Sequence, residues 1–168
     1  MRLHPEVEIF VGSIPDGVAG IEATLATMGA IVREYRRNPE VRGVALEILE
    51  SVESKNYVGE ARALFHYVQR TIRYTQDPDG VEWVQTPDKT ILIGHGDCDD
   101  MATLLATMLA SVGKPTRFVA AGFNGGPIEH VWTEVKIGGR WFAMDPTEIE
   151  AEFGWKPPGI TETRVWHN

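Results

Sequence analysis

Three side chains of this 168-residue chain have the types and the order that thiol-based acyl chemistry requires. Cys98 is the only cysteine, His130 follows it, and Asp145 follows His130. In such chemistry a thiol attacks a carbonyl carbon, an imidazole takes the thiol proton, and a carboxylate fixes the tautomer of the imidazole. A single cysteine followed by a histidine and an acid therefore predicts a candidate nucleophile with its base and orienting group.

The element that must position Cys98 is a helix beginning at that residue. Apolar side chains follow Cys98 at steps of three and four, and Gly113 and Pro115 end the pattern. Asp97 suits the N-cap and Asp100 a capping-box partner, so Cys98 becomes the first helical residue. There the helix dipole favours a thiolate, and the backbone N–H of Cys98 is available to an oxyanion. The carboxylates of Asp97, Asp99 and Asp100 oppose this, because nearby negative charge raises the pKa of a thiol.

A hairpin must bring His130 and Asp145 together. Gly138-Gly139 predicts a two-residue turn between strands over Glu129–Ile137 and Arg140–Asp145. That turn fixes the register, so Asp145 opposes Trp132 and His130 opposes Thr147. His130 and Asp145 are then diagonal neighbours on one face, about 7–8 Å apart at Cα and within side-chain reach. A bulge between these strands would break the prediction.

The rest of the chain predicts a single α+β domain. Periodic apolar residues predict amphipathic helices over 18–37, 41–52 and 57–72, and a strand is predicted over Thr116–Phe123. We expect the segments 73–93 and 146–168 to be irregular, because they are rich in Pro, Gly and other turn residues.

Composition narrows the partners. The formal net charge of −8 argues against nucleic acid or an anionic membrane and favours a polypeptide substrate. One cysteine excludes an intramolecular disulfide framework. The sequence contains neither a signal-peptide pattern nor an apolar run long enough to span a bilayer, so a cytoplasmic location is expected.

These motifs together resemble the transglutaminase-like superfamily of papain-fold cysteine enzymes. The resemblance rests on Thr86-Pro87, the run from Gly96 to Ala102, the run from His130 to Val135, Gly139-Arg140-Trp141 and Asp145-Pro146. It implies a papain-like core over residues 57–147, with the cysteine-bearing helix packed on an antiparallel sheet. Residues 1–52 would form a helical N-terminal extension within the single domain 1–168.

The resemblance also implies roles for further residues. An upstream side chain often completes the oxyanion hole in papain-like sites, and Trp83 and Gln85 are candidates. Trp132 is a candidate for the wall of the site. A related group of bacterial peptidases binds calcium through acids beside the cysteine, and Asp97 and Asp99 match that placement. Calcium takes six to eight oxygen ligands. Because no other residues complete such a site in the sequence, neither a metal nor another cofactor is expected.

The expected reaction is acyl transfer on an amide, with peptide or isopeptide hydrolysis the first choice. Glutamine transamidation or deamidation would use the same Cys98, His130 and Asp145. A third interpretation is a catalytically inactive assembly module that binds a protein partner through the helices of residues 18–52. Small phage and prophage proteins of this family would suit that role.

Overall fold

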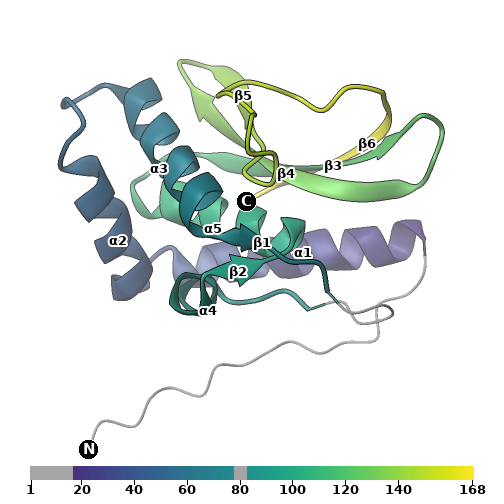
Figure 1. Cartoon of the computed structure of the whole chain (residues 1–168), viewed down its shortest axis with the longest axis horizontal. Helices are drawn as coiled ribbons and strands as arrows, with labels where there is room; N and C mark the ends of the chain where they lie inside the picture. The colour runs from purple at the N-terminus through teal and green to yellow at the C-terminus, as the bar shows by residue number, and fades with distance from the viewer. Residues whose placement is uncertain (1–16, 78–82) are drawn as a thin grey trace, which may run out of the picture.

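The computed structural model describes residues 17–77 and 83–168. Its first half is helical, with α1, α2 and α3 spanning Val18–Tyr35, Pro39–Leu49 and Tyr57–Thr71. Each begins where the sequence predicts within a few residues. Asn38 caps α2 by accepting hydrogen bonds from the backbone of Glu40 and Val41, and Pro39 occupies the first turn. Figure 1 shows these helices on one side of the sheet.

The segment predicted to be irregular before Cys98 contains regular structure. It holds a short strand β1 (Arg73–Tyr74) and a helix α4 (Pro87–Ile93), which Gly94 ends in the left-handed conformation. The prediction was wrong at α4 because this helix has only seven residues, too few to show a periodic apolar stripe. Strand β2 (His95–Gly96) then pairs in parallel with β1 and leads directly into α5 (Cys98–Ser111).

The second half forms a four-stranded antiparallel sheet in the order β5-β4-β3-β6. The strands span Thr116–Phe123 (β3), Ile128–Ile137 (β4), Arg140–Met144 (β5) and Ile160–His167 (β6). Strand β6 contradicts the expectation of an irregular segment over 146–168. It lies at an edge of the sheet with most of its side chains exposed, so its sequence lacks the apolar alternation that identifies a half-buried strand.

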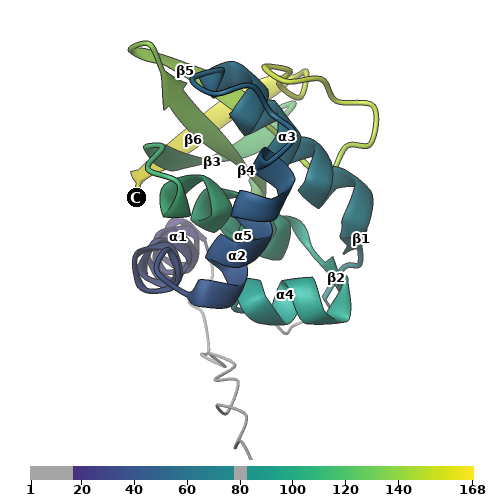
Figure 2. The same cartoon turned by 90° about the vertical axis from the view of Figure 1, so that its left-hand side faces the viewer.

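Helix α5 is the centre of the molecule, and the sheet and α4 lie on opposite sides of it (Figure 2). It contacts α1, α2, α3 and α4, as well as strands β3 and β4. One apolar cluster joins α5 to α2 and α3 through Leu64, Phe65, Leu105 and other buried residues. A second cluster joins α5 to α1 and to the inner face of the sheet. The helix that begins at Cys98 is therefore held in place by other helices and by the sheet.

The N-terminal helices are part of this core. Leu25, Met28, Ile31 and Val32 of α1 are buried against α5 and the sheet. Val41 and Ala45 of α2 are buried with α3 and α5. A protein partner of residues 18–52 would therefore meet only the outer faces of these helices.

Candidate active site

Cys98 is the first residue of α5, as predicted. Asp97 is the N-cap, and its Oδ1 accepts hydrogen bonds from the backbone N–H groups of Asp99 and Asp100 at 3.0 and 3.1 Å. Asp100 completes the capping box by accepting from the Asp97 N–H at 3.2 Å. At this position the N–H of Cys98 has no acceptor within the helix. The cap therefore holds the thiol and the free N–H of Cys98 together at the start of α5.

The surroundings of the thiol favour its neutral form. Burial raises the pKa of Cys98 well above its ordinary value, and the charges of Asp99 and Asp97 raise it further. The thiol donates a hydrogen bond to Asp99 Oδ1 at 3.6 Å, which acts in the same direction. A backbone hydrogen bond from Val131 lowers the pKa without reversing the shift. Burial first, and then the acidic neighbours, therefore favour the neutral thiol at Cys98.

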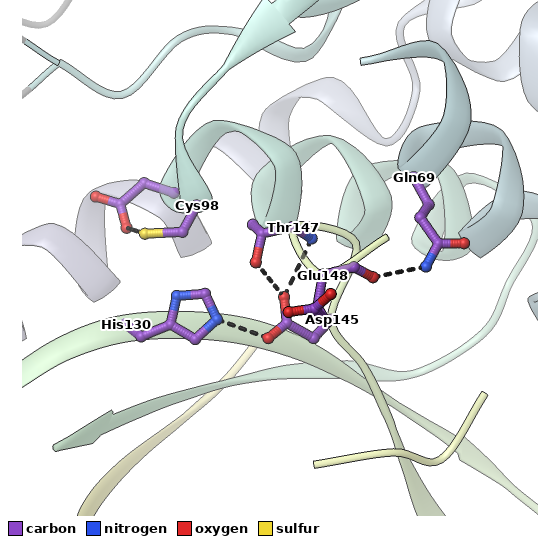
Figure 3. A network of polar contacts seen from close by, with 7 residues as sticks. Gln69, Cys98, His130, Asp145, Thr147 and Glu148 are labelled. Atoms are coloured by element: carbon purple, nitrogen blue, oxygen red, sulfur yellow. Dashed lines mark hydrogen bonds and ion pairs between the residues drawn. The ribbon is translucent and has the colours of Figure 1, made fainter. Parts of the chain in front are cut away.

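The hairpin brings His130 and Asp145 into direct contact. The pairs from Ile137–Arg140 to Thr133–Met144 follow the predicted register throughout. Asp145 is the residue after β5, and its Oδ2 lies 2.6 Å from His130 Nε2. With Asp145 ionised, Nε2 carries the proton and donates it, which leaves Nδ1 as an acceptor. Figure 3 shows the opposite edge of the imidazole turned toward Cys98.

Further contacts hold the two side chains in place. Thr147 donates to Asp145 Oδ1 from its hydroxyl at 2.7 Å and from its backbone at 3.2 Å. The His130 ring lies near two aromatic rings, with centroid distances of 6.4 Å to Phe123 and 6.1 Å to Trp132. The imidazole and the buried carboxylate therefore have little freedom to separate.

Helix α3 anchors the segment that follows Asp145. The Gln69 amide donates hydrogen bonds to the carbonyl oxygens of Glu148 and Ala151 at 2.8 and 3.0 Å, as Figure 3 shows for Glu148. Thr147 was predicted only to oppose His130, and Gln69 was not predicted as part of the site. The register signals Thr147, because it places that residue opposite His130, but no sequence pattern links Gln69 to a site 79 residues later.

The three residues expected to line the site have different environments. Gln85 is tied to Asp100, since its backbone N–H donates to Oδ1 at 2.7 Å and its amide nitrogen to Oδ2 at 2.8 Å. Trp83 is partly exposed and its backbone N–H donates to Asp77. Trp132 is 1% exposed and packs with Val119, Ala121 and Ala143.

The Gln85 contact has an electrostatic consequence for Asp100. Burial first, and then the charge of Asp97, raise the pKa of Asp100 to about 7, although the donors of Gln85 and Asp97 lower it. The hydrogen-bonded amide therefore serves a buried carboxyl group rather than pointing toward the thiol. This removes Gln85 as the simplest source of an oxyanion donor.

The acids beside Cys98 do not assemble the ligand set that calcium needs. In residues 17–77 and 83–168, no three or more His, Cys, Asp or Glu side chains converge as a metal site. Asp97 Oδ1 serves the helix cap, and Asp99 Oδ1 accepts from the thiol. We derive no step of the chemistry through a metal ion.

Sequence and structure comparisons place this site in a family. The profile of the Transglutaminase-like superfamily matches residues 42–146. The chain belongs to the transglutaminase-like superfamily. The matched region holds Cys98, His130 and Asp145 and begins inside α2. Among curated proteins, no relative matches the chain.

Several solved structures share the fold of this chain. LapG of Legionella pneumophila in its calcium-bound form has a TM-score of 0.58 and 16% identity, covering 85% of this chain and 87% of LapG. A candidate protease from Parabacteroides distasonis has a TM-score of 0.61 and 17% identity, covering 73% of this chain and 26% of that one. A candidate cysteine protease from Cytophaga hutchinsonii has a TM-score of 0.53 and 17% identity, covering 80% and 52%.

The lengths of these relatives differ from that of this chain. The alignments reach only about a quarter and a half of the Parabacteroides and Cytophaga chains. At such identities the comparison shows a common fold. Separately, no helix within 17–77 or 83–168 has both the length and the apolar character needed to cross a bilayer.

Proposed function

We propose that this protein is a cysteine-dependent amide hydrolase that cleaves peptide or isopeptide bonds with Cys98, His130 and Asp145. The observation that carries the proposal is the 2.6 Å contact between His130 Nε2 and Asp145, with the other edge of the imidazole turned toward Cys98. A base oriented by a buried carboxylate and facing a thiol at a helix start is the arrangement that nucleophilic acyl chemistry uses. Membership of the superfamily supports the same function.

The raised pKa of Cys98 decides how the reaction begins. Because the resting thiol is neutral, His130 Nδ1 takes its proton as sulfur attacks the carbonyl carbon. A C–S bond forms, the carbonyl π electrons move to oxygen, and Asp145 stabilises the imidazolium. The tetrahedral intermediate then collapses, and the departing amine takes the proton from His130.

The second half of the cycle returns the enzyme to its starting state. Neutral His130 accepts a proton from water as the water oxygen attacks the thioester. The C–S bond breaks, the acid product leaves, and the proton returns to sulfur. With a glutamine side-chain amide as the acyl donor and an amine in place of water, the same steps would give transamidation and release ammonia.

The test is incubation of the protein with unfolded polypeptides, followed by mass spectrometry with and without an added primary amine. Hydrolysis produces new peptide termini, transamidation attaches the amine to glutamine, and deamidation converts glutamine to glutamate. We expect new termini from the wild type and none from Cys98→Ala. We expect His130→Ala to lower the rate about 10²- to 10⁴-fold.

A matched histidine controls for general damage. His167 is exposed at the end of β6, and its ring packs against Trp141, so His167→Ala should retain activity. A wild-type protein that neither cleaves nor modifies any substrate, and whose Cys98 is not acylated by an activated ester, would overturn the proposal. The assembly-module interpretation, with the outer faces of α1 and α2 as the binding surface, would then lead.

A further inference from the structure

The oxyanion of the proposed reaction needs a second donor besides the backbone N–H of Cys98. The amide of Gln85 already donates to Asp100 Oδ2 at 2.8 Å. Trp132 is almost fully buried among Val119, Ala121 and Ala143. An oxyanion hole with a single donor is weak, since each preorganised donor contributes about 10²- to 10³-fold to the rate.

Strand β1 places a different donor beside the start of α5. Tyr74 pairs in parallel with Gly96, two residues before Cys98, and the Thr75 N–H donates to the Gly96 carbonyl at 2.8 Å. A Cβ at Gly96 would lie 2.6 Å from Asp100 Cβ, so this face of β2 is directed at the first turn of α5. Residues paired across two strands project from the same face. The side chain of Tyr74 therefore projects toward the helix start that carries Cys98, and Figure 1 shows β1 and β2 beside that end of α5.

The electrostatic neighbours of Tyr74 agree with this direction. Burial raises the pKa of Tyr74, and so do the charges of Asp97, Asp99 and Asp145 and that of Cys98 when it is ionised. A phenol that interacts with both Cys98 and Asp145 lies near both the helix and the sheet halves of the site. The shift keeps the hydroxyl protonated, and thus able to donate, across the neutral and mildly alkaline range.

The exposure of Tyr74 fits contact with a substrate. Its side chain is 48% exposed, whereas Asp97, Asp99 and Asp145 are all buried. A half-exposed phenol next to a partly exposed nucleophile can meet a carbonyl group arriving from solvent. Tyr74 therefore lies near Cys98 and is partly open to solvent.

We propose that the Tyr74 hydroxyl donates a hydrogen bond to the oxyanion that forms when Cys98 attacks an amide carbonyl, together with the backbone N–H of Cys98. This assignment rests on the proposed function. Tyr74 keeps its proton throughout, so the proton balance between Cys98, His130 and the leaving amine is unchanged. The phenol stabilises the negative charge on oxygen only while the tetrahedral intermediate exists.

Two reactions of Cys98 distinguish an oxyanion donor from a residue that merely supports the thiol. Acylation by p-nitrophenyl acetate passes through a tetrahedral oxyanion, whereas alkylation by iodoacetamide displaces iodide and forms none. We expect Tyr74→Phe to slow acylation about 10²- to 10³-fold while alkylation changes less than about twofold. Tyr57 is 56% exposed on α3, so Tyr57→Phe removes a hydroxyl outside the site and should change neither rate. Near-ultraviolet circular dichroism checks that each variant is folded.

Three other outcomes would contradict the role of Tyr74, and one of them would also contradict the proposed function. If Tyr74→Phe is acylated at the wild-type rate, Tyr74 is not an oxyanion donor, and the proposed function stands. If acylation and alkylation fall together, the hydroxyl acts on the thiol and the assignment is again wrong. If the wild type is alkylated but never acylated, the proposed function fails and the role of Tyr74 fails with it.

Discussion

Asp99 is the residue through which the reactivity of Cys98 can be measured. Its carboxylate accepts a hydrogen bond from the thiol, and after burial its charge is the largest contribution raising the pKa of Cys98. We expect alkylation of the wild type to rise with pH through a midpoint above that of an ordinary thiol. Because Asp99→Asn removes a negative charge that disfavours the thiolate, its midpoint should move to lower pH. Iodoacetamide labelling across a pH series measures both values.

A second acidic residue supplies the control for this prediction. Asp88 lies in the first turn of α4 and accepts from the Lys89 backbone, so Asp88→Asn should leave the midpoint where it is in the wild type. An identical midpoint in Asp99→Asn and in the wild type would show that burial alone raises the pKa. A wild-type midpoint below the ordinary thiol value would contradict the neutral resting thiol altogether.

At the level of single residues, the three proposed reacting groups could be predicted from the sequence, but the neighbouring residues that contact them could not. Cys98, His130 and Asp145 were predicted from type, order and hairpin register, and the structure brings His130 and Asp145 to 2.6 Å. Their catalytic roles stay a prediction. Tyr74 was missed because its partner Gly96 is set by a parallel pairing of two short strands. A pairing between segments this short and this far apart has no periodic signal in sequence.

At the scale of elements, the close packing of β2 on α5 is the most sensitive point near the site. A methyl group at Gly96 would lie 2.6 Å from Asp100 Cβ and 2.8 Å from its Oδ2. We expect Gly96→Ala to lower the free energy of unfolding by about 1–3 kcal/mol, which is the usual cost of overpacking. It should also slow acylation of Cys98, because the first turn of α5 must move.

Gly43 gives the matched comparison. It lies within α2 with no atom within 4 Å of an added Cβ, so Gly43→Ala should stabilise the protein by about 1 kcal/mol through helix propensity. Urea unfolding followed by tryptophan fluorescence measures both changes. If Gly96→Ala were as stable as the wild type, the first turn of α5 could shift away from β2 at no cost, and the packing of β2 would not determine its position.

The accuracy of prediction differed among elements for physical reasons. Helix α5 was predicted with its cap because an apolar stripe, an N-cap acid and a terminal glycine agree. The β4–β5 register was predicted because a two-residue turn allows only one way to pair the residues of the two strands. Helix α4 and strand β6 were missed because one is too short and the other too exposed to carry the usual pattern.

At the scale of the whole molecule, α1 is expected to contribute to stability. Met28 is fully buried in the cluster that joins α1 to α5 and the sheet. Met28→Ala should lower the free energy of unfolding by about 2–5 kcal/mol, the usual cost of a large-to-small change in a core. Leu46→Ala, at a 43% exposed position of α2, should cost well under about 1 kcal/mol. Urea titrations of the two variants measure the difference.

Wild-type stability in Met28→Ala would show instead that α1 is an appendage that can be removed. That result would favour the interpretation in which residues 18–52 serve a partner, because their buried faces would then be available. Loss of stability would mean that removing this region damages the core, so deletion could not isolate a binding function.

The contact between Trp166 and Gly29 ties the last strand to the first helix. An added Cβ at Gly29 would lie 2.4 Å from the Trp166 indole nitrogen, and β6 pairs along β3 beside it. During synthesis on the ribosome, α1 is made long before the strand that covers it. The part of α1 around Gly29 therefore stays uncovered until residues 160–167 emerge, although α5 can cover the rest earlier. Ribosome-bound chains that end before β6 should consequently be more sensitive to protease at α1 than chains in which β6 has emerged.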